Sequence, residues 1–148
     1  MKAAFKILAV DDNPSITDAM PSIFAAPRYE LTTANNGNRA LEKLEATPLD
    51  FDVIIVDQNM PQLSGVELVR EIRERGIPSK IMVLSAELSP EIREAYEQMN
   101  VHMILSKPFS FEELRLATYL LVKDWDSPPS ATPLVAEPVS SVCALTSE

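Results

Sequence analysis

The chain has 148 residues, a length typical of one folded domain, and its acidic residues outnumber its basic residues by 22 to 13. The resulting net charge of −9 opposes binding to nucleic acid, because carboxylates and backbone phosphates repel each other. A single cysteine and a single histidine exclude an internal disulfide and every zinc site built from these two residue types. The three glycines, Gly37, Gly65 and Gly76, are spaced too widely for a Walker loop or a dinucleotide fingerprint.

Uninterrupted apolar stretches are short throughout the chain. The longest, such as residues 7–10 and 53–56, fall far below the roughly 18 residues that a membrane-spanning helix needs. The apolar run after Lys6 meets two aspartates within a few residues, which is too short for a secretory signal. We therefore predict no membrane insertion and a location in the reducing cytoplasm.

Five short apolar segments alternate with five amphipathic segments, which predicts an α/β fold with a parallel sheet. Two of the segments are continuously apolar rather than alternating, as expected of central strands that helices cover on both faces. The predicted strands are residues 6–10, 29–34, 52–56, 80–84 and 102–105.

Helix-capping residues precede most of the amphipathic segments. Asn13 and Pro14 open the first predicted helix, and Pro21 is expected to kink it or end it early, since proline removes a backbone donor. The other helices are predicted near 38–46, near 66–75 with Gly76 as terminator, after the cap Ser89, and after Ser110 with a capping box to Glu113.

The composition changes after about Asp124, where prolines, serines and threonines become frequent and no lysine or arginine follows. We expect residues 1–123 to form the domain and 124–148 to be a disordered tail or linker, in which Cys143 is an idle thiol. The alternative for this segment is a docking peptide that uses its apolar residues, Leu134, Val135, Val139, Val142 and Leu145.

Polar residues follow four of the predicted strands. Asp11 and Asp12 come after the first, Asp57 ends the third, Ser85 the fourth and Lys107 the fifth. These strand ends share one edge of a parallel sheet, where open α/β folds bind ligands. Three carboxylates in one small site repel each other unless a hard divalent cation joins them, and Mg²⁺ suits oxygen ligands best. A lysine and a hydroxyl at the same edge can hold a phosphoryl group, which an aspartate can attack.

With these residues in view, the chain from Lys6 to about Lys123 resembles the receiver domain of two-component response regulators. The resemblance implies a doubly wound, flavodoxin-like fold with five helices around a five-stranded parallel sheet of order 2-1-3-4-5. The matching motifs are Asp11-Asp12-Asn13, Asp57-Gln58-Asn59-Met60-Pro61 leading to Gly65, Ser85-Ala86 and Lys107-Pro108-Phe109.

The resemblance implies that Asp57 is the phosphoacceptor. It further implies Mg²⁺ bound by Asp12, Asp57 and the backbone carbonyl of Asn59, with Asp11 acting through water. Lys107 and Ser85 are implied as contacts to the phosphoryl oxygens, and the peptide bond between Lys107 and Pro108 as cis.

Three positions refine the resemblance. Ile104 stands where the family usually has an aromatic side chain that swings inward, so we expect a muted readout or one carried by the loop before the fourth helix. Asn59 and Glu87 occupy positions that tune acyl phosphate hydrolysis in the family. Their identity resembles that of chemotaxis-type, single-domain regulators, which indicates a short-lived signal.

The implied function is that of a phosphorelay response regulator, not of a turnover enzyme. Its phosphoryl donor would be the phosphohistidine of a histidine kinase or phosphotransfer protein, because the chain's own His102 is predicted about 16 Å from the site. It would signal to a downstream protein by contact, without binding nucleic acid. The resemblance also allows a homodimer, formed through the face of the fourth helix, fifth strand and fifth helix.

Two alternative functions stand beside this one. A degenerate receiver that acts as an unphosphorylated adaptor stays open because of Ile104. An aspartate-nucleophile phosphatase is disfavoured, since Asn59 stands where such enzymes place a general acid. We expect structural roles for two other residues: Met60 fills the core, and Tyr96 packs at the surface.

Overall fold

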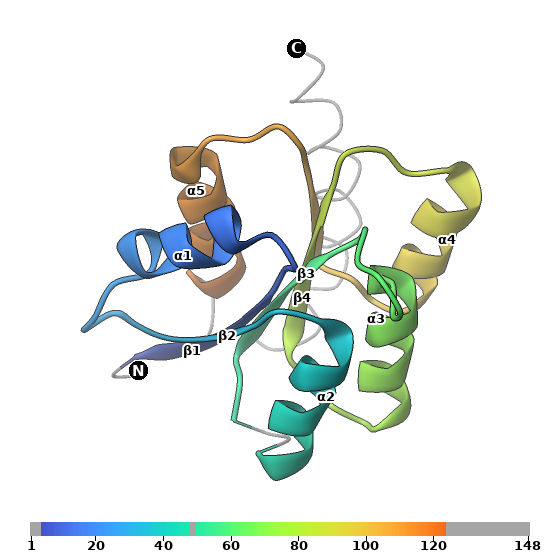
Figure 1. The fold of residues 1–148 in the computed structure, drawn as a ribbon, viewed down its shortest axis with the longest axis horizontal. Helices are drawn as coiled ribbons and strands as arrows, with labels where there is room; N and C mark the ends of the chain where they lie inside the picture. The colour runs from blue at the N-terminus through green and yellow to red at the C-terminus, as the bar shows by residue number, and fades with distance from the viewer. Residues whose placement is uncertain (1–3, 48–49, 124–148) are drawn as a thin grey trace.

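The computed structural model describes residues 4–47 and 50–123, so the expectations for residues 124–148, Cys143 included, lie outside the described residues. Strands and helices alternate along the described chain (Figure 1). They are β1 (Phe5–Val10), α1 (Pro14–Ile23), β2 (Tyr29–Ala34), α2 (Gly37–Ala46), β3 (Val53–Asp57), α3 (Gly65–Glu74), β4 (Lys80–Ser85), α4 (Pro90–Gln98), β5 (Met103–Ser106) and α5 (Phe111–Val122).

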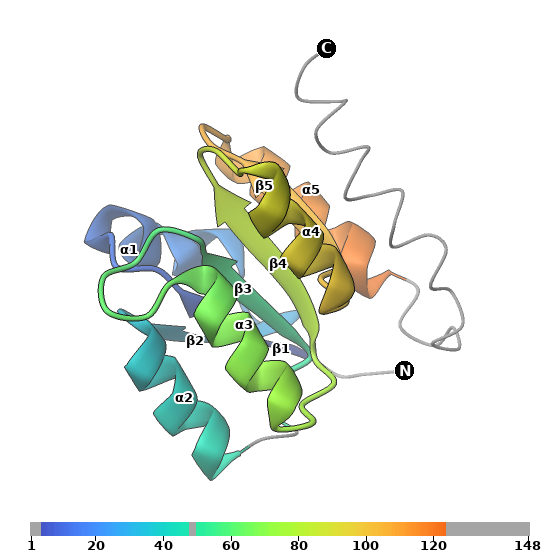
Figure 2. The same ribbon diagram turned by 90° about the vertical axis from the view of Figure 1, so that its right-hand side faces the viewer.

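The sheet has all strands parallel, in the order β2-β1-β3-β4-β5. Helices α1 and α5 lie on one side of it, and α2, α3 and α4 lie on the other (Figures 1 and 2). This arrangement confirms the predicted doubly wound, flavodoxin-like fold. The central strand β3 is buried along its whole length, which explains why its sequence is apolar without alternation.

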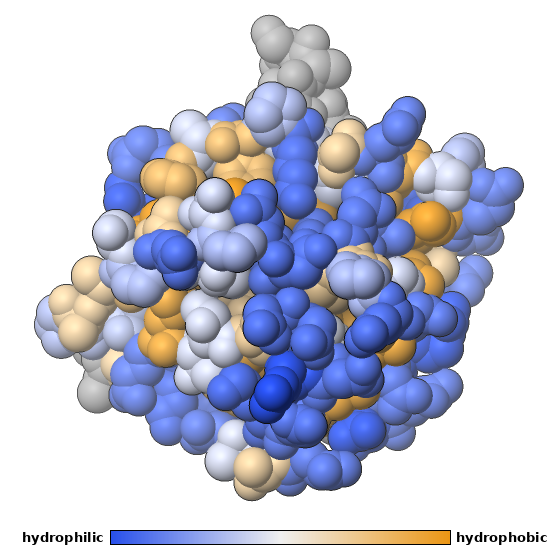
Figure 3. All heavy atoms as spheres, viewed as in Figure 1, coloured by the Kyte–Doolittle hydropathy of each residue, from blue (hydrophilic) through white to orange (hydrophobic). Residues whose placement is uncertain are grey.

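Alternate residues of the strands supply two separate hydrophobic cores. In β1, Leu8 and Val10 pack toward α2, α3 and α4, whereas Ile7 and Ala9 pack toward α1 and α5. Met60 is buried in the first of these cores, in agreement with its predicted role. The face seen in Figure 3 is mostly hydrophilic, with hydrophobic side chains in small, scattered groups. Among the described residues, we find no helix long and apolar enough to span a membrane.

The strand ends differ slightly from the predicted ranges in a way that matters for function. Strands β3 and β4 include Asp57 and Ser85, and β5 begins at Met103 and includes Ser106. Helix α1 continues through Pro21 and ends two residues later, because the donor that proline lacks belongs to the last turn only. The predicted caps at the starts of α1, α4 and α5 are present, and α3 has a further capping box between Ser64 and Glu67.

The prediction that Tyr96 packs at the surface is wrong. Its side chain is fully buried within the core formed with α2, α3 and α4. Ile92, Tyr96 and Met99 recur at helical spacing, and all three face this core, Ile92 and Met99 from its margin. This apolar stripe places the tyrosine ring toward the sheet.

Arg73 joins three segments near the edge where the parallel strands begin. Its guanidinium donates hydrogen bonds to the carbonyls of Ile77 at 2.8 Å and Ser79 at 3.1 Å, between α3 and β4. It also donates to Met99 at 2.8 Å and Asn100 at 3.0 Å, after α4. One side chain therefore satisfies four loop carbonyls, which is the kind of group whose removal leaves acceptors unpaired.

His102 lies at this same edge, as predicted, although it comes directly before β5 and is not the first residue of the strand. Its Nδ1 accepts a hydrogen bond from the backbone N–H of Ile81 at 3.3 Å. Burial, followed by the charges of Arg73 and Lys80, lowers the pKa of His102 to about 4. The imidazole is therefore neutral at physiological pH, and it lies far from the residues that follow the strands.

We predict that Arg73→Met lowers the free energy of unfolding by about 2–4 kcal/mol, since several carbonyls lose a charged donor. Urea unfolding followed by circular dichroism measures this loss. The matched control is Arg70→Met, on the exposed side of the same helix, which should change stability by less than about 0.5 kcal/mol. Equal losses in the two variants would contradict the role given to Arg73.

Candidate functional site

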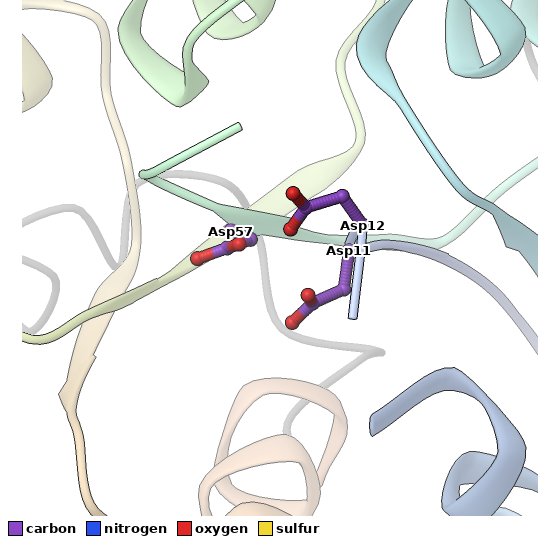
Figure 4. Close-up of side chains that lie close together, drawn as sticks. All are labelled: Asp11, Asp12 and Asp57. Carbon is purple, nitrogen blue, oxygen red and sulfur yellow. The ribbon is translucent and has the colours of Figure 1, made fainter. Parts of the chain in front are cut away.

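Three aspartates meet at the carboxyl ends of two neighbouring strands. Val10 pairs with Val56 in the register of β1 and β3, so the residues that follow, Asp11 and Asp57, emerge side by side. Asp12 comes next along the chain, and one carboxylate oxygen of each aspartate lies within 4.8 Å of the others. Figure 4 shows the three side chains gathered at this edge. Asp11 and Asp57 are buried, and Asp12 is exposed.

Lys107 contributes the positive charge of the site. Its Nζ donates to Oδ1 of Asp57 at 3.0 Å, and the lysine side chain is 29% exposed against 3% for the aspartate. The backbone N–H of Asn59 donates to the same oxygen at 3.4 Å. Lys107 follows β5 at a peptide bond to Pro108 that is cis, as the resemblance implied. The buried carboxylate of Asp57 is therefore paired with an ammonium group whose side chain is itself partly exposed.

The negative charge of Asp11 is destabilised by its surroundings. Its Oδ1 accepts from the N–H of Asn13 at 2.9 Å, but its buried Oδ2 has no hydrogen-bond partner among the described residues. Burial, and then the charge of Asp57, raise the pKa of Asp11 to about 6, although the bond from Asn13 and the charge of Lys107 oppose this. A bound cation would relieve both the repulsion and the unpaired oxygen, so this donor set fits a hard divalent metal.

Ser85 lies one residue beyond Leu84, which pairs with Asp57, and so belongs to the same edge of the sheet. Its hydroxyl donates to the carbonyl of Glu87 at 3.1 Å and accepts from the N–H of Glu87 at 3.2 Å. The serine is thus held in the turn after β4. Glu87 itself is exposed.

Ile104 is buried, and it lines a pocket of about 200 Å³ together with Ser85 and the turn after β4. The structure therefore brings Asp11, Asp12, Asp57 and Lys107 into one cluster. It places Ser85, Glu87 and Ile104 around the adjoining turn.

Two residues beside this cluster, Gln58 and Tyr96, were not predicted to belong to it. Gln58, directly after Asp57, is buried, and its side-chain oxygen accepts a hydrogen bond from the hydroxyl of Tyr96 on α4. The helical stripe that contains Tyr96 was a usable signal for its burial. A glutamine in a loop offers no such signal, because its partner is far away in the sequence.

We predict that Asp11→Asn stabilises the metal-free protein in a pH-dependent way. Because the folded chain raises the pKa of Asp11 from 3.8 to about 6, the carboxyl favours folding below about pH 4 and loses that contribution as the pH rises through 6. The amide variant should therefore gain on the order of 1–3 kcal/mol at about pH 7 and little below about pH 4.

Urea unfolding in the presence of a metal chelator measures this gain at both pH values. Asp18→Asn, an exposed position on α1, serves as the control and should leave the pH dependence unchanged. An equal gain at both pH values would show that the raised pKa of Asp11 is not the cause.

Comparison with known proteins places this cluster in a family. The family model for the response regulator receiver domain matches residues 7–119. The chain is 32% identical over 110 residues to a CpxR homolog, a transcriptional regulatory protein of Haemophilus influenzae, covering 74% of the chain and 46% of that protein. It is 34% identical over 109 residues to the response regulator MprA of Mycobacterium leprae, covering 74% and 47%. The chain thus spans about half the length of the curated relatives it matches.

Solved structures give the same result. The chemotaxis response regulator CheY4 of Vibrio cholerae is 35% identical, with a TM-score of 0.71 over 80% of this chain and 98% of that chain. A receiver domain protein of Methanospirillum hungatei, 21% identical with a TM-score of 0.76 over 83% and 97% of the two chains, shares the fold. The chain belongs to the receiver domain family of two-component response regulators.

Proposed function

We propose that the chain accepts a phosphoryl group on Asp57 from a phosphohistidine of another protein and then signals by protein contact. Phosphorylation on aspartate is typical of receiver domains, which are signalling modules rather than turnover enzymes. The observation that carries the proposal is the buried carboxylate of Asp57, held between Lys107 and the two other aspartates. A surface aspartate in a turn would have neither the lysine nor the acidic cluster.

In the proposed reaction, a carboxylate oxygen of Asp57 attacks phosphorus. An oxygen–phosphorus bond forms as the nitrogen–phosphorus bond of the phosphohistidine breaks, and the electron pair leaves with the imidazole. Lys107, already at 3.0 Å from Asp57, would offset the charge of the phosphoryl oxygens. The hydroxyl of Ser85 would turn from Glu87 toward the same group.

Acidic clusters of this kind are typical of Mg²⁺ binding in receiver domains. Asp12, Asp57 and the backbone carbonyl of Asn59 would hold the ion, and the unpartnered Oδ2 of Asp11 would accept from water on it. When bound, the ion supplies positive charge that offsets the repulsion between the phosphoryl group and the carboxylates. Asn59 and Glu87, both exposed at the rim of the site, would set how fast water removes the phosphoryl group.

Family membership implies a kinase or phosphotransfer protein as the phosphoryl donor. The position of His102 at the other edge of the sheet supports a donor on a separate protein. For output, the exposed Leu116, Tyr119 and Leu120 on α5 offer apolar surface for a downstream protein or a second copy of the chain. Contact of this kind would suit a cytoplasmic, acidic protein better than direct binding to DNA.

We predict that Asp57→Asn abolishes phosphoryl uptake and leaves the fold intact, because it removes the nucleophile and one negative charge of the cluster. Intact mass after incubation with acetyl phosphate and Mg²⁺ should show one added phosphoryl group on the wild type and on Asp18→Asn, and none on Asp57→Asn. Uptake by Asp57→Asn would refute the assignment. A wild type that gains no mass would favour the unphosphorylated adaptor.

We further predict that Asp12→Ala weakens Mg²⁺ binding by roughly tenfold or more and that Asp11→Ala weakens it less. The reason is that a direct metal ligand contributes more than a residue that acts through water. Isothermal titration of the two variants and the wild type with Mg²⁺ gives the ratio. Equal losses, or a larger loss for Asp11→Ala, would reverse the roles given to the two aspartates.

A further inference from the structure

Gln58 connects the segment after Asp57 to three other elements. Its N–H donates to the carbonyl of Leu84 in β4 at 2.9 Å, and its carbonyl accepts from the N–H of Gly65 at the start of α3 at 3.0 Å. Its side-chain oxygen accepts from the hydroxyl of Tyr96 on α4. A displacement of Gln58 would therefore disturb hydrogen bonds to β4, α3 and α4.

The hydroxyl of Tyr96 lies close to the backbone that carries Asp57. A Cβ atom added at Gly65 would come within 2.7 Å of this hydroxyl, 2.8 Å of the Cα of Gln58 and 2.9 Å of the carbonyl oxygen of Asp57. Contacts this short are not tolerated, so only glycine leaves room here for the tyrosine. One closely packed unit therefore reaches from the acidic cluster to α4; it consists of Asp57, Gln58, Gly65 and Tyr96.

The charge of Asp57 also acts on this hydroxyl. Burial, and then the negative charge of Asp57, raise the pKa of Tyr96, so its hydroxyl stays protonated and donates at physiological pH. Conversion of Asp57 to an acyl phosphate adds charge and bulk next to Gln58. A buried donor that loses its acceptor must find another partner, so a change at Gln58 moves Tyr96 rather than leaving it unpaired.

We propose that Tyr96 couples the state of Asp57 to helix α4 through its hydrogen bond to Gln58. The bond holds α4 in one position while Asp57 is unmodified, and it rearranges when the phosphoryl group arrives. The inference rests on the proposed function and assigns it an output element. Ile104 lies in the same apolar core as Tyr96 and carries no polar group, so the hydrogen-bonded route to α4 belongs to the tyrosine.

Tyrosine ring carbons provide a direct test, since the chain contains only Tyr29, Tyr96 and Tyr119. With tyrosine labelled with ¹³C at Cζ, addition of Mg²⁺ and beryllofluoride, a mimic of the phosphoryl group, should shift the signal of Tyr96. The signal of Tyr29, in the core on the other side of the sheet, should stay in place. An unmoved Tyr96 signal, in a protein whose Asn59 amide shows that the mimic has bound, overturns the proposal.

Tyr96→Phe keeps the ring and removes only the hydroxyl. We expect it to take up a phosphoryl group from acetyl phosphate as the wild type does, but to lose at least half of the beryllofluoride-induced amide shifts in α4. Gln58→Met, which removes the acceptor and keeps the tyrosine, should show the same loss. Tyr29→Phe, in the core on the other side of the sheet, should show none. Wild-type α4 shifts in both Tyr96→Phe and Gln58→Met overturn the coupling while phosphoryl uptake stands. Absence of any mass gain or amide shift in the wild type overturns the proposed function and the coupling together.

Discussion

Mutual repulsion among Asp11, Asp12 and Asp57 governs the chemistry of the candidate site. Two of these carboxylates are buried, and the paired ends of β1 and β3 fix their backbones side by side, so the charges cannot separate. The positive charge of Lys107 offsets part of this negative charge through its contact with Asp57. The pKa of Asp11 is raised, and its Oδ2 has no hydrogen-bond partner within the described chain. Part of the repulsion between the carboxylates is therefore not compensated. A site of this kind is stabilised by a ligand that brings positive charge.

The opposite edge of the sheet, where the strands begin, has well hydrogen-bonded polar groups instead of repelling charges. At this edge, Arg73 donates hydrogen bonds to four loop carbonyls, and Lys80 donates to the carbonyl of Leu121 at 2.6 Å. These bonds fix the ends of α3, α4 and α5 on the side away from the aspartates. The helix starts and turns at the other edge then carry the candidate site. Tyr96 and Gln58 link that edge to α4 in the region where the proposed signal arises.

Much of the fold and of the candidate site could be predicted from the sequence, because local signals fix them. Continuously apolar runs marked the buried strands, and Asn13, Ser89 and Ser110 marked helix starts. Parallel strands deliver the residues at their ends to one edge, so the clustering of the three aspartates and Lys107 followed from their positions. The strand order and the cis peptide came from the resemblance to receiver domains rather than from any pattern in the chain.

The pair Gln58 and Tyr96 could not be predicted in the same way. Their contact joins residues 38 positions apart, and no local rule says which loop glutamine a buried tyrosine will reach. Tyrosine is at home both in a core and at a surface, so its burial on α4 depended on the stripe with Ile92 and Met99. The room for its hydroxyl depends on Gly65, whose importance appears only when the three segments are packed together.

The proposed role of Asp57 as phosphoacceptor can be tested by locating the acyl phosphate in the chain. Borohydride reduction of the protein after phosphotransfer, followed by peptide mapping, converts a phosphorylated aspartate to homoserine and so marks its position. We expect homoserine at residue 57 alone, which would identify Asp57 as the phosphoacceptor. Homoserine at residue 11 or 12, or unmodified peptides throughout, would contradict it.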